Sequence, residues 1–124
     1  MSKPSEDFLN TVDPLAIQML ARLNTPGTND FVFEMIAAFL AKAPLILTQL
    51  EDSLRAQDRA KIYGLAHNFK SVAASVGAKA VASLAEEIES RATEKTWDLL
   101  AAKIAVLEQA FSATRIELLK INAN

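Results

Sequence analysis

The stretch DRAKIYGLAHNFKSVAASVGA, residues 58–78, contains the only histidine of the chain. An α-helix drawn through it at about 100° per residue places one apolar stripe opposite His67, which predicts a buried face. The stripe consists of Ile62, Leu65, Phe69, Val72 and Val76. Asp58 is a residue type preferred at an N-cap, and Gly77 is the type preferred just past the C-terminus of a helix. The sequence therefore predicts a helix that begins after Asp58 and ends at Gly77.

The opposite side of this helix is open around His67. Apart from Tyr63 and Lys70, its side chains are all small: Ala60, Gly64, Ser71, Ala74 and Ser75. This clearing predicts an imidazole that another protein can reach without displacing bulky neighbours. Lys70 lies one helical turn after His67, where a cation disfavours imidazolium and favours an anion attached to the ring. An ordinary exposed histidine on a helix rich in Ala and Ser is an equally good interpretation of the wheel alone.

Length and composition limit the class of protein. The chain has 124 residues, the length of one domain with a single core, and 51% of them are hydrophobic. It contains no cysteine, which excludes a disulfide framework and a thiolate metal site and makes the cytoplasm the expected compartment. A net charge of −2 without a basic run argues against nucleic acid or an anionic membrane as a partner.

The N-terminal part of the chain predicts a lead and a short helix. Residues 1–12 are expected to be a flexible lead, and residues 13–122 to form the domain. Asp13 followed by Pro14 is typical of an N-cap and a first helical residue, and predicts a short packing helix to about residue 23. The initial Met and the short polar lead favour a free-standing protein over a domain excised from a larger kinase.

Three longer helices are expected beside the one that holds His67. The first begins at Thr28 or Asn29 and ends near residue 56, and its apolar stripe is wide enough for two neighbouring helices or for a partner protein. Pro44 should kink this helix without ending it. The other two cover residues 78–91 and the segment that begins at Thr93. Short links predict an all-α fold, an antiparallel four-helix bundle with an additional short N-terminal helix.

Two features of these helices are interpreted as structural. The most apolar run, residues 31–47, is interrupted by charges and by Pro44, and is expected to be too short to span a bilayer. Glu86, Glu87 and Glu89 are interpreted as a solvated face, because a carboxylate metal site needs a second cluster and the sequence shows none. No metal site is predicted.

The run Ala66-His67-Asn68-Phe69-Lys70-Ser71, followed by Gly77-Ala78, resembles the signature of histidine-containing phosphotransfer (HPt) domains. That signature has Ala-His, a Lys three residues after the His, a small residue next, and Gly-Ala ten residues after the His. Every spacing is matched, and the resemblance extends over about residues 13–119, with Leu84, Ile88 and Glu89 also fitting. The commonest residue after the Lys is Gly; Ser71 stands there instead, still small, with a hydroxyl that could bond a phosphoryl oxygen.

The resemblance implies a function and its residues. His67 would accept and donate a phosphoryl group through Nε2, with Lys70 beside the phosphoryl oxygens. The partners would be receiver domains of response regulators and a sensor (hybrid) histidine kinase. The receiver would hold the magnesium ion, so no cofactor is expected here. The inner docking surface would consist of Tyr63, Gly64, Asn68, Ala74 and Ser75.

The sequence also predicts what kind of relay protein this would be. It has no glycine-rich loop to hold ATP, which favours a phosphorelay intermediate without autokinase activity. The family's usual habit suggests a monomer. An alternative is a non-catalytic helical adaptor that binds a protein through the wide stripe on residues 31–54. A metal- or cofactor-binding bundle is disfavoured, because the single histidine forms no Glu-x-x-His pair.

Overall fold

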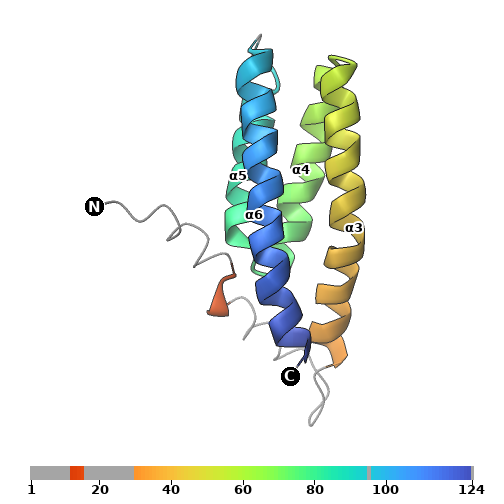
Figure 1. Cartoon of the computed structure of the whole chain (residues 1–124), viewed down its shortest axis with the longest axis vertical. Coiled ribbons are helices and arrows are strands. Elements are labelled where there is room, and N and C mark those ends of the chain that lie inside the picture. The colour runs from red at the N-terminus through yellow and green to blue at the C-terminus, as the bar shows by residue number, and fades with distance from the viewer. Residues whose placement is uncertain (1–11, 16–29, 95, 124) are drawn as a thin grey trace, which may run out of the picture.

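The computed structural model describes residues 12–15, 30–94 and 96–123. Most of these residues lie in four helices. They are α3 (Asp30–Arg55), α4 (Arg59–Ser75), α5 (Lys79–Arg91) and α6 (Trp97–Ala123). Consecutive helices run in opposite directions (Figure 1), and the ring closes because α6 also contacts α3. The predicted antiparallel four-helix bundle is confirmed.

The core joins the helices through aromatic and aliphatic side chains. The ring of Phe39 on α3 stacks on that of Phe69 on α4, with 6.1 Å between centroids. It meets Phe111 of α6 edge-on at 5.8 Å. All three side chains are buried, and burial of one such side chain stabilises the fold by roughly 1.5–3 kcal/mol. Phe39 thus links α3 to both α4 and α6 through the core.

Both ends of α4 are fixed by local hydrogen bonds. The Asp58 side chain accepts from the backbone N–H of Lys61 at 3.1 Å, as an N-cap does. At the other end Gly77 has φ 72°, the left-handed conformation. The N–H of Gly77 donates to Ala74 at 3.1 Å and the N–H of Ala78 to Ala73 at 2.9 Å, which is a Schellman motif. Both predicted ends of the helix are confirmed.

The buried face of α4 is rotated slightly from the predicted stripe. Ile62, Phe69 and Val76 are fully buried, but Leu65 and Val72 are only half-buried. Their places in the core are taken by two small residues, Ala66 and Ala73. The reason is that α4 packs against both α3 and α5, so the centre of its buried face points between two neighbours.

The wide apolar stripe of α3 is explained by its two neighbours, α4 and α6. The helix continues through Pro44, which is exposed. By length and composition alone, Phe31–Arg55 could cross a membrane. The expectation that the apolar run is too short is therefore wrong, because the helix extends well beyond residue 47. In this fold its apolar side chains instead fill the shared core: Val32, Ile36, Phe39, Ala43, Ile46, Leu47 and Leu50.

The last helix begins later than predicted, at Trp97 instead of Thr93. The N–H of Glu94 donates to Arg91 at 2.9 Å in a turn, so Thr93 belongs to the link that reverses the chain. The side chain of Arg59 holds this link, because its Nη1 donates to the Ala92 carbonyl at 3.2 Å and its Cζ lies 3.9 Å from the Trp97 ring centroid. The apolar side chains of one seam of α6 lie in the core or pack against it: Trp97, Leu100, Ile104, Leu107, Phe111, Leu118 and Ile121.

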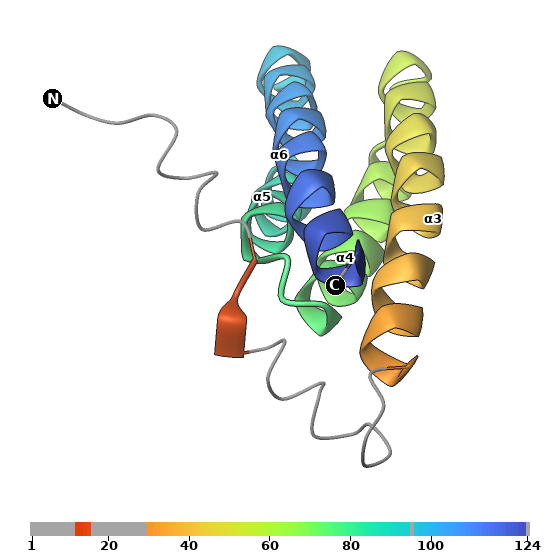
Figure 2. The same cartoon turned by 60° about the horizontal axis from the view of Figure 1, so that its bottom comes forward.

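The N-terminal segment touches the bundle at the turn between α4 and α5 (Figure 2). The Asp13 side chain accepts from the N–H of Leu15 at 3.0 Å, as the predicted N-cap should. The Asp13 N–H donates to the carbonyl of Gly77 at 2.6 Å. Val12, the last residue of the predicted flexible lead, packs against the core. Residues 1–11 of that lead, the rest of the predicted short helix and the caps at Thr28 or Asn29 lie outside the described residues.

Candidate functional site

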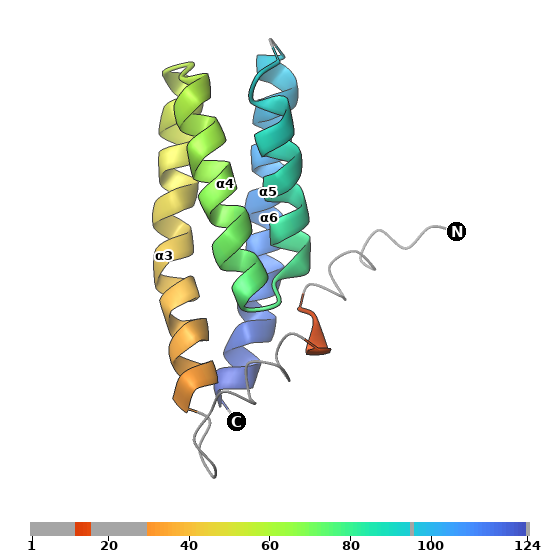
Figure 3. The same cartoon turned by 180° about the vertical axis from the view of Figure 1, so that it is seen from behind.

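The imidazole of His67 on α4 reaches Glu89 of α5, the helix that lies beside α4 (Figure 3). The side chain of His67 is 59% exposed, and its Nδ1 lies 2.8 Å from Oε2 of Glu89. A carboxylate can only accept a hydrogen bond, so Nδ1 carries a proton. In the neutral ring Nε2 therefore holds the lone pair, and no described side chain forms a hydrogen bond with it. The site presents a nucleophilic nitrogen to solvent.

Glu89 is shared between the ring and a cation. Its Oε1 lies 2.8 Å from Nζ of Lys70, and its side chain is only 12% exposed. The hydrogen bond from Lys70, and next that from His67, hold the pKa of Glu89 below its ordinary value. The hydrogen bond to Glu89 in turn raises the pKa of Lys70. Around neutral pH the site therefore holds an ionised Glu89 carboxylate between the Lys70 ammonium group and the ring of His67.

The interpretation of Glu89 as part of a solvated face is therefore wrong, although Glu86 and Glu87 are exposed as expected. Two signals could have shown this. Glu89 follows the buried Ala85 by four residues, so it lies on the same side of α5. It also lies twelve residues after Gly77, whereas His67 lies ten before it. Two antiparallel helices of equal rise that meet at this turn bring those residues to one level.

The remaining predicted docking residues are all exposed and lie on α4 before and after His67. The phenol of Tyr63 lies parallel to the imidazole, with 6.4 Å between centroids and 3° between planes. A Cβ added to Gly64 would meet nothing within 4 Å, so this glycine leaves open space and is not required by packing. Like these two, Asn68, Ala74 and Ser75 are exposed. The structure confirms the open clearing, and a docking role for it stays a prediction.

The hydroxyls near the ring bond to their own helix. Ser71 donates to the His67 carbonyl at 3.4 Å, a long and weak contact, and is exposed. Ser75 donates to Val72 at 2.6 Å. A weakly held hydroxyl such as that of Ser71 can rotate toward another acceptor.

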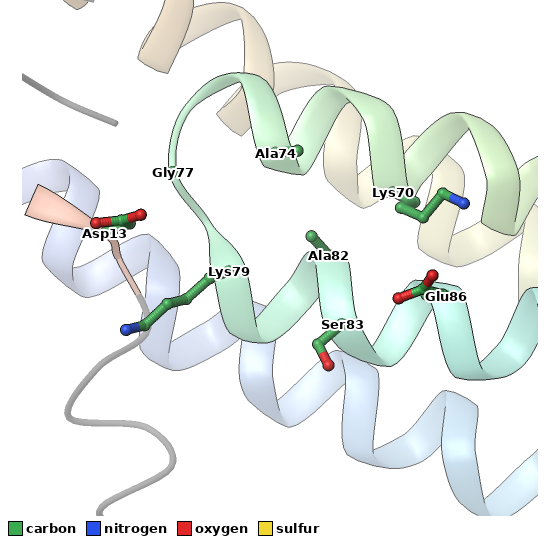
Figure 4. Close-up of a pocket in the computed structure, with 8 residues that line it drawn as sticks. All are labelled: Asp13, Lys70, Ala74, Gly77, Lys79, Ala82, Ser83 and Glu86. Carbon is green, nitrogen blue, oxygen red and sulfur yellow. The ribbon is translucent and has the colours of Figure 1, made fainter. Parts of the chain in front are cut away.

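A groove of about 340 Å³ leads from the site down the seam between α4 and α5 (Figure 4). Its centre is lined by small residues, since Ala74 and Ala82 approach from opposite helices. Lys70 and Glu86 line the end near His67, whereas Asp13, Gly77 and Lys79 line the other end, and Ser83 lies between the two ends beside Ala82. The described residues contain no group of three acidic or histidine side chains placed to hold a metal ion.

An exposed histidine on a helix of a four-helix bundle is what the resemblance to histidine-containing phosphotransfer domains predicts. The family model for the Hpt domain matches residues 34–117, and the chain belongs to this family. It is a histidine phosphotransfer protein of a phosphorelay.

A solved structure supports the fold. The chain is similar to histidine-containing phosphotransfer protein B (HptB) from Pseudomonas aeruginosa PAO1, with 21% identity and a TM-score of 0.82. The match covers 91% of this chain and 95% of that one. At this identity the likeness shows a shared bundle and leaves the site residues to be argued from the geometry. The comparison with curated proteins found no match.

Proposed function

We propose that His67 carries the phosphoryl group, through Nε2, between the aspartates of receiver domains. The observation that supports this is that only one ring nitrogen has a partner among the described residues. Nδ1 lies 2.8 Å from the Glu89 carboxylate, and the side chain of His67 is 59% exposed. A neutral imidazole nitrogen is a good nucleophile near pH 7. The single histidine of the chain is thus held in the tautomer that phosphorylation at Nε2 requires.

The transfer needs position and charge neutralisation more than covalent machinery. The lone pair of Nε2 attacks phosphorus of the aspartyl phosphate, and the bond from phosphorus to the aspartate oxygen breaks. Lys70 lies one turn from the ring and supplies a cation toward the phosphoryl oxygens, and the Ser71 hydroxyl supplies a donor. The receiver brings the magnesium ion and the acidic pocket, so the chain works without a cofactor of its own.

The partner docks on the clearing around His67. Tyr63, Gly64, Asn68, Ala74 and Ser75 form the inner contact, because these exposed and mostly small residues let a receiver approach the ring closely. The chain acts as a monomeric, cytoplasmic intermediate without autokinase activity, and a hybrid sensor kinase supplies the phosphate through its receiver. The adaptor alternative loses its main support, since two neighbouring helices account for the wide stripe of α3.

The test is labelling by a phosphorylated receiver in the presence of magnesium. The label should enter the wild-type protein, be lost in acid and stable in alkali, and be absent from His67→Gln. Label that persists in His67→Gln would falsify the assignment of the site. Binding of the receiver that is insensitive to His67, without any transfer, would support the adaptor instead.

A further inference from the structure

Glu89 contacts the ring nitrogen that does not react, and this position suggests a role after phosphorylation. Its Oε2 lies 2.8 Å from Nδ1 of His67, and its Oε1 lies 2.8 Å from Nζ of Lys70. Its side chain is mostly withdrawn from water, at 12% exposed. A hydrogen-bonded carboxylate with little contact to water stabilises a positive charge on the group it faces.

The charge on the ring changes during the transfer. When Nε2 forms its bond to phosphorus, Nδ1 keeps its proton, so the ring becomes a phosphorylated imidazolium. In the onward step an aspartate oxygen attacks phosphorus, the bond from nitrogen to phosphorus breaks, and the electron pair returns to Nε2. With the Nδ1 proton in place, the leaving group is a neutral imidazole. Without that proton, it would be an imidazolate anion, which leaves much less readily.

We propose that Glu89 is a positioning residue that keeps the Nδ1 proton on the phosphorylated ring, so that phospho-His67 stays transferable at neutral pH. This inference rests on the proposed function for the identity of the phosphorylated residue. It adds that the carboxylate sets the pH range over which phospho-His67 transfers its phosphoryl group to an aspartate or loses it by hydrolysis.

The charged and titratable groups near the ring act in opposite directions. Glu89 on α5 favours the protonated ring. Lys70 on α4 opposes it, because this cation shares the same carboxylate. Glu86 on α5 attracts the Lys70 cation, and Tyr63 on α4 lies parallel to the imidazole. Among the described residues, α3 and α6 place no charged side chain in hydrogen-bonding or ion-pairing distance of the imidazole.

The experiment uses the full chain phosphorylated chemically with phosphoramidate, which needs no receiver and can label only one histidine. The phosphorus NMR shift, followed against pH, reports the midpoint at which the phosphorylated ring loses its proton. We expect the midpoint of Glu89→Gln to lie about one pH unit below that of the wild type. Above both midpoints, loss of the phosphoryl group should then slow by up to about tenfold.

Two further variants separate this effect from a change in structure. Glu87→Gln makes the same change in charge on α5 but faces α6, where Glu87 pairs with Lys103 at 2.8 Å, so its midpoint should equal that of the wild type. Lys70→Ala should raise the midpoint, the opposite direction to Glu89→Gln. If Glu89→Gln fails to fold, this rise in Lys70→Ala still tests the inference.

The outcomes distinguish this inference from the proposed function. Equal midpoints in Glu89→Gln and the wild type would overturn the role of Glu89, even if a receiver labels His67. Failure of phosphoramidate to label the wild type would also count against it, because the held tautomer leaves Nε2 free to react. Failure of every receiver to label a protein that shows the expected shift would overturn the relay proposal and leave this inference intact.

Discussion

The two faces of α4 differ in what they require from their side chains. On the buried face, Phe69 and Ile62 are fully enclosed and must fit their neighbours. On the open face, His67 and Ala74 are exposed. A single helix therefore has a packed side and a side that holds the proposed phosphorylation site. We therefore expect substitutions on the buried face to change the stability of the protein, and substitutions on the open face to change phosphoryl transfer.

The largest expected effect lies on the buried face. Phe69→Ala removes a fully buried ring that stacks on Phe39, and should lower the free energy of unfolding by about 3–5 kcal/mol. Chemical denaturation measures this loss. The adjacent exposed residue is the matched control, since Asn68→Ala should change stability by less than about 0.5 kcal/mol. Similar losses in the two variants would mean that the faces are not distinct.

The next effect concerns docking on the open face. Ala74→Arg places a long side chain in the groove between α4 and α5, opposite Ala82. We expect transfer from a phosphorylated receiver to slow by about tenfold or more, the rate change that corresponds to about 1.4 kcal/mol, while the fold is kept. Ala105→Arg, on the exposed side of α6, is the control and should transfer normally. Unchanged transfer in Ala74→Arg would show that the receiver docks elsewhere.

A smaller effect is expected for Lys70→Ala. The variant loses the cation one turn from His67, so transfer from the receiver should slow several-fold, as measured by rapid-quench labelling. Thermal stability should change little, because Lys70 lies off the buried face of α4 and Glu89 keeps its hydrogen bond to His67. Lys61→Ala, at an exposed position of the same helix, serves as control. A collapse of thermal stability would place Lys70 in the structural part of the helix instead.

The smallest effect lies away from α4. Burial, together with repulsion from Glu51, raises the pKa of Glu108 above its ordinary value of 4.5. A raised pKa in the folded state means that the stability from this group is fully present below pH 4.5 and is lost as pH rises through the folded pKa. Glu108→Gln cannot ionise, so it should be more stable than the wild type at pH 7, by up to about 1 kcal/mol.

The pH dependence of the stability gain in Glu108→Gln shows whether the gain comes from ionisation of Glu108. Thermal denaturation at several pH values should show the advantage of Glu108→Gln shrinking toward zero in acid. Glu51→Gln should give a smaller gain, because it relieves the repulsion and leaves the burial. A gain that is constant with pH would show that ionisation of Glu108 is not its cause.

Much of the fold could be predicted because it depends on local periodicity. The ends of α4 at Asp58 and Gly77 follow from the conformational preferences of those residue types. The start of α6 could not be located in the same way. Thr93 is as good a cap as any by sequence, but the chain needs it in the link that Arg59 holds to Trp97. A contact between distant segments decided that boundary.

The sequence by itself determined that Ile62, Phe69 and Val76 face the core and that His67 lies on the other side of α4, because the rotation per residue of a helix fixes its faces. Only the tertiary structure decided that Glu89 reaches both the imidazole and Lys70. That meeting joins residues 22 positions apart, and it depends on the register and separation of two helices. The tight turn at Gly77 sets the register of α4 and α5, and the small residues between the two helices set their separation. The periodicity of one helix alone cannot predict how it lies against another helix.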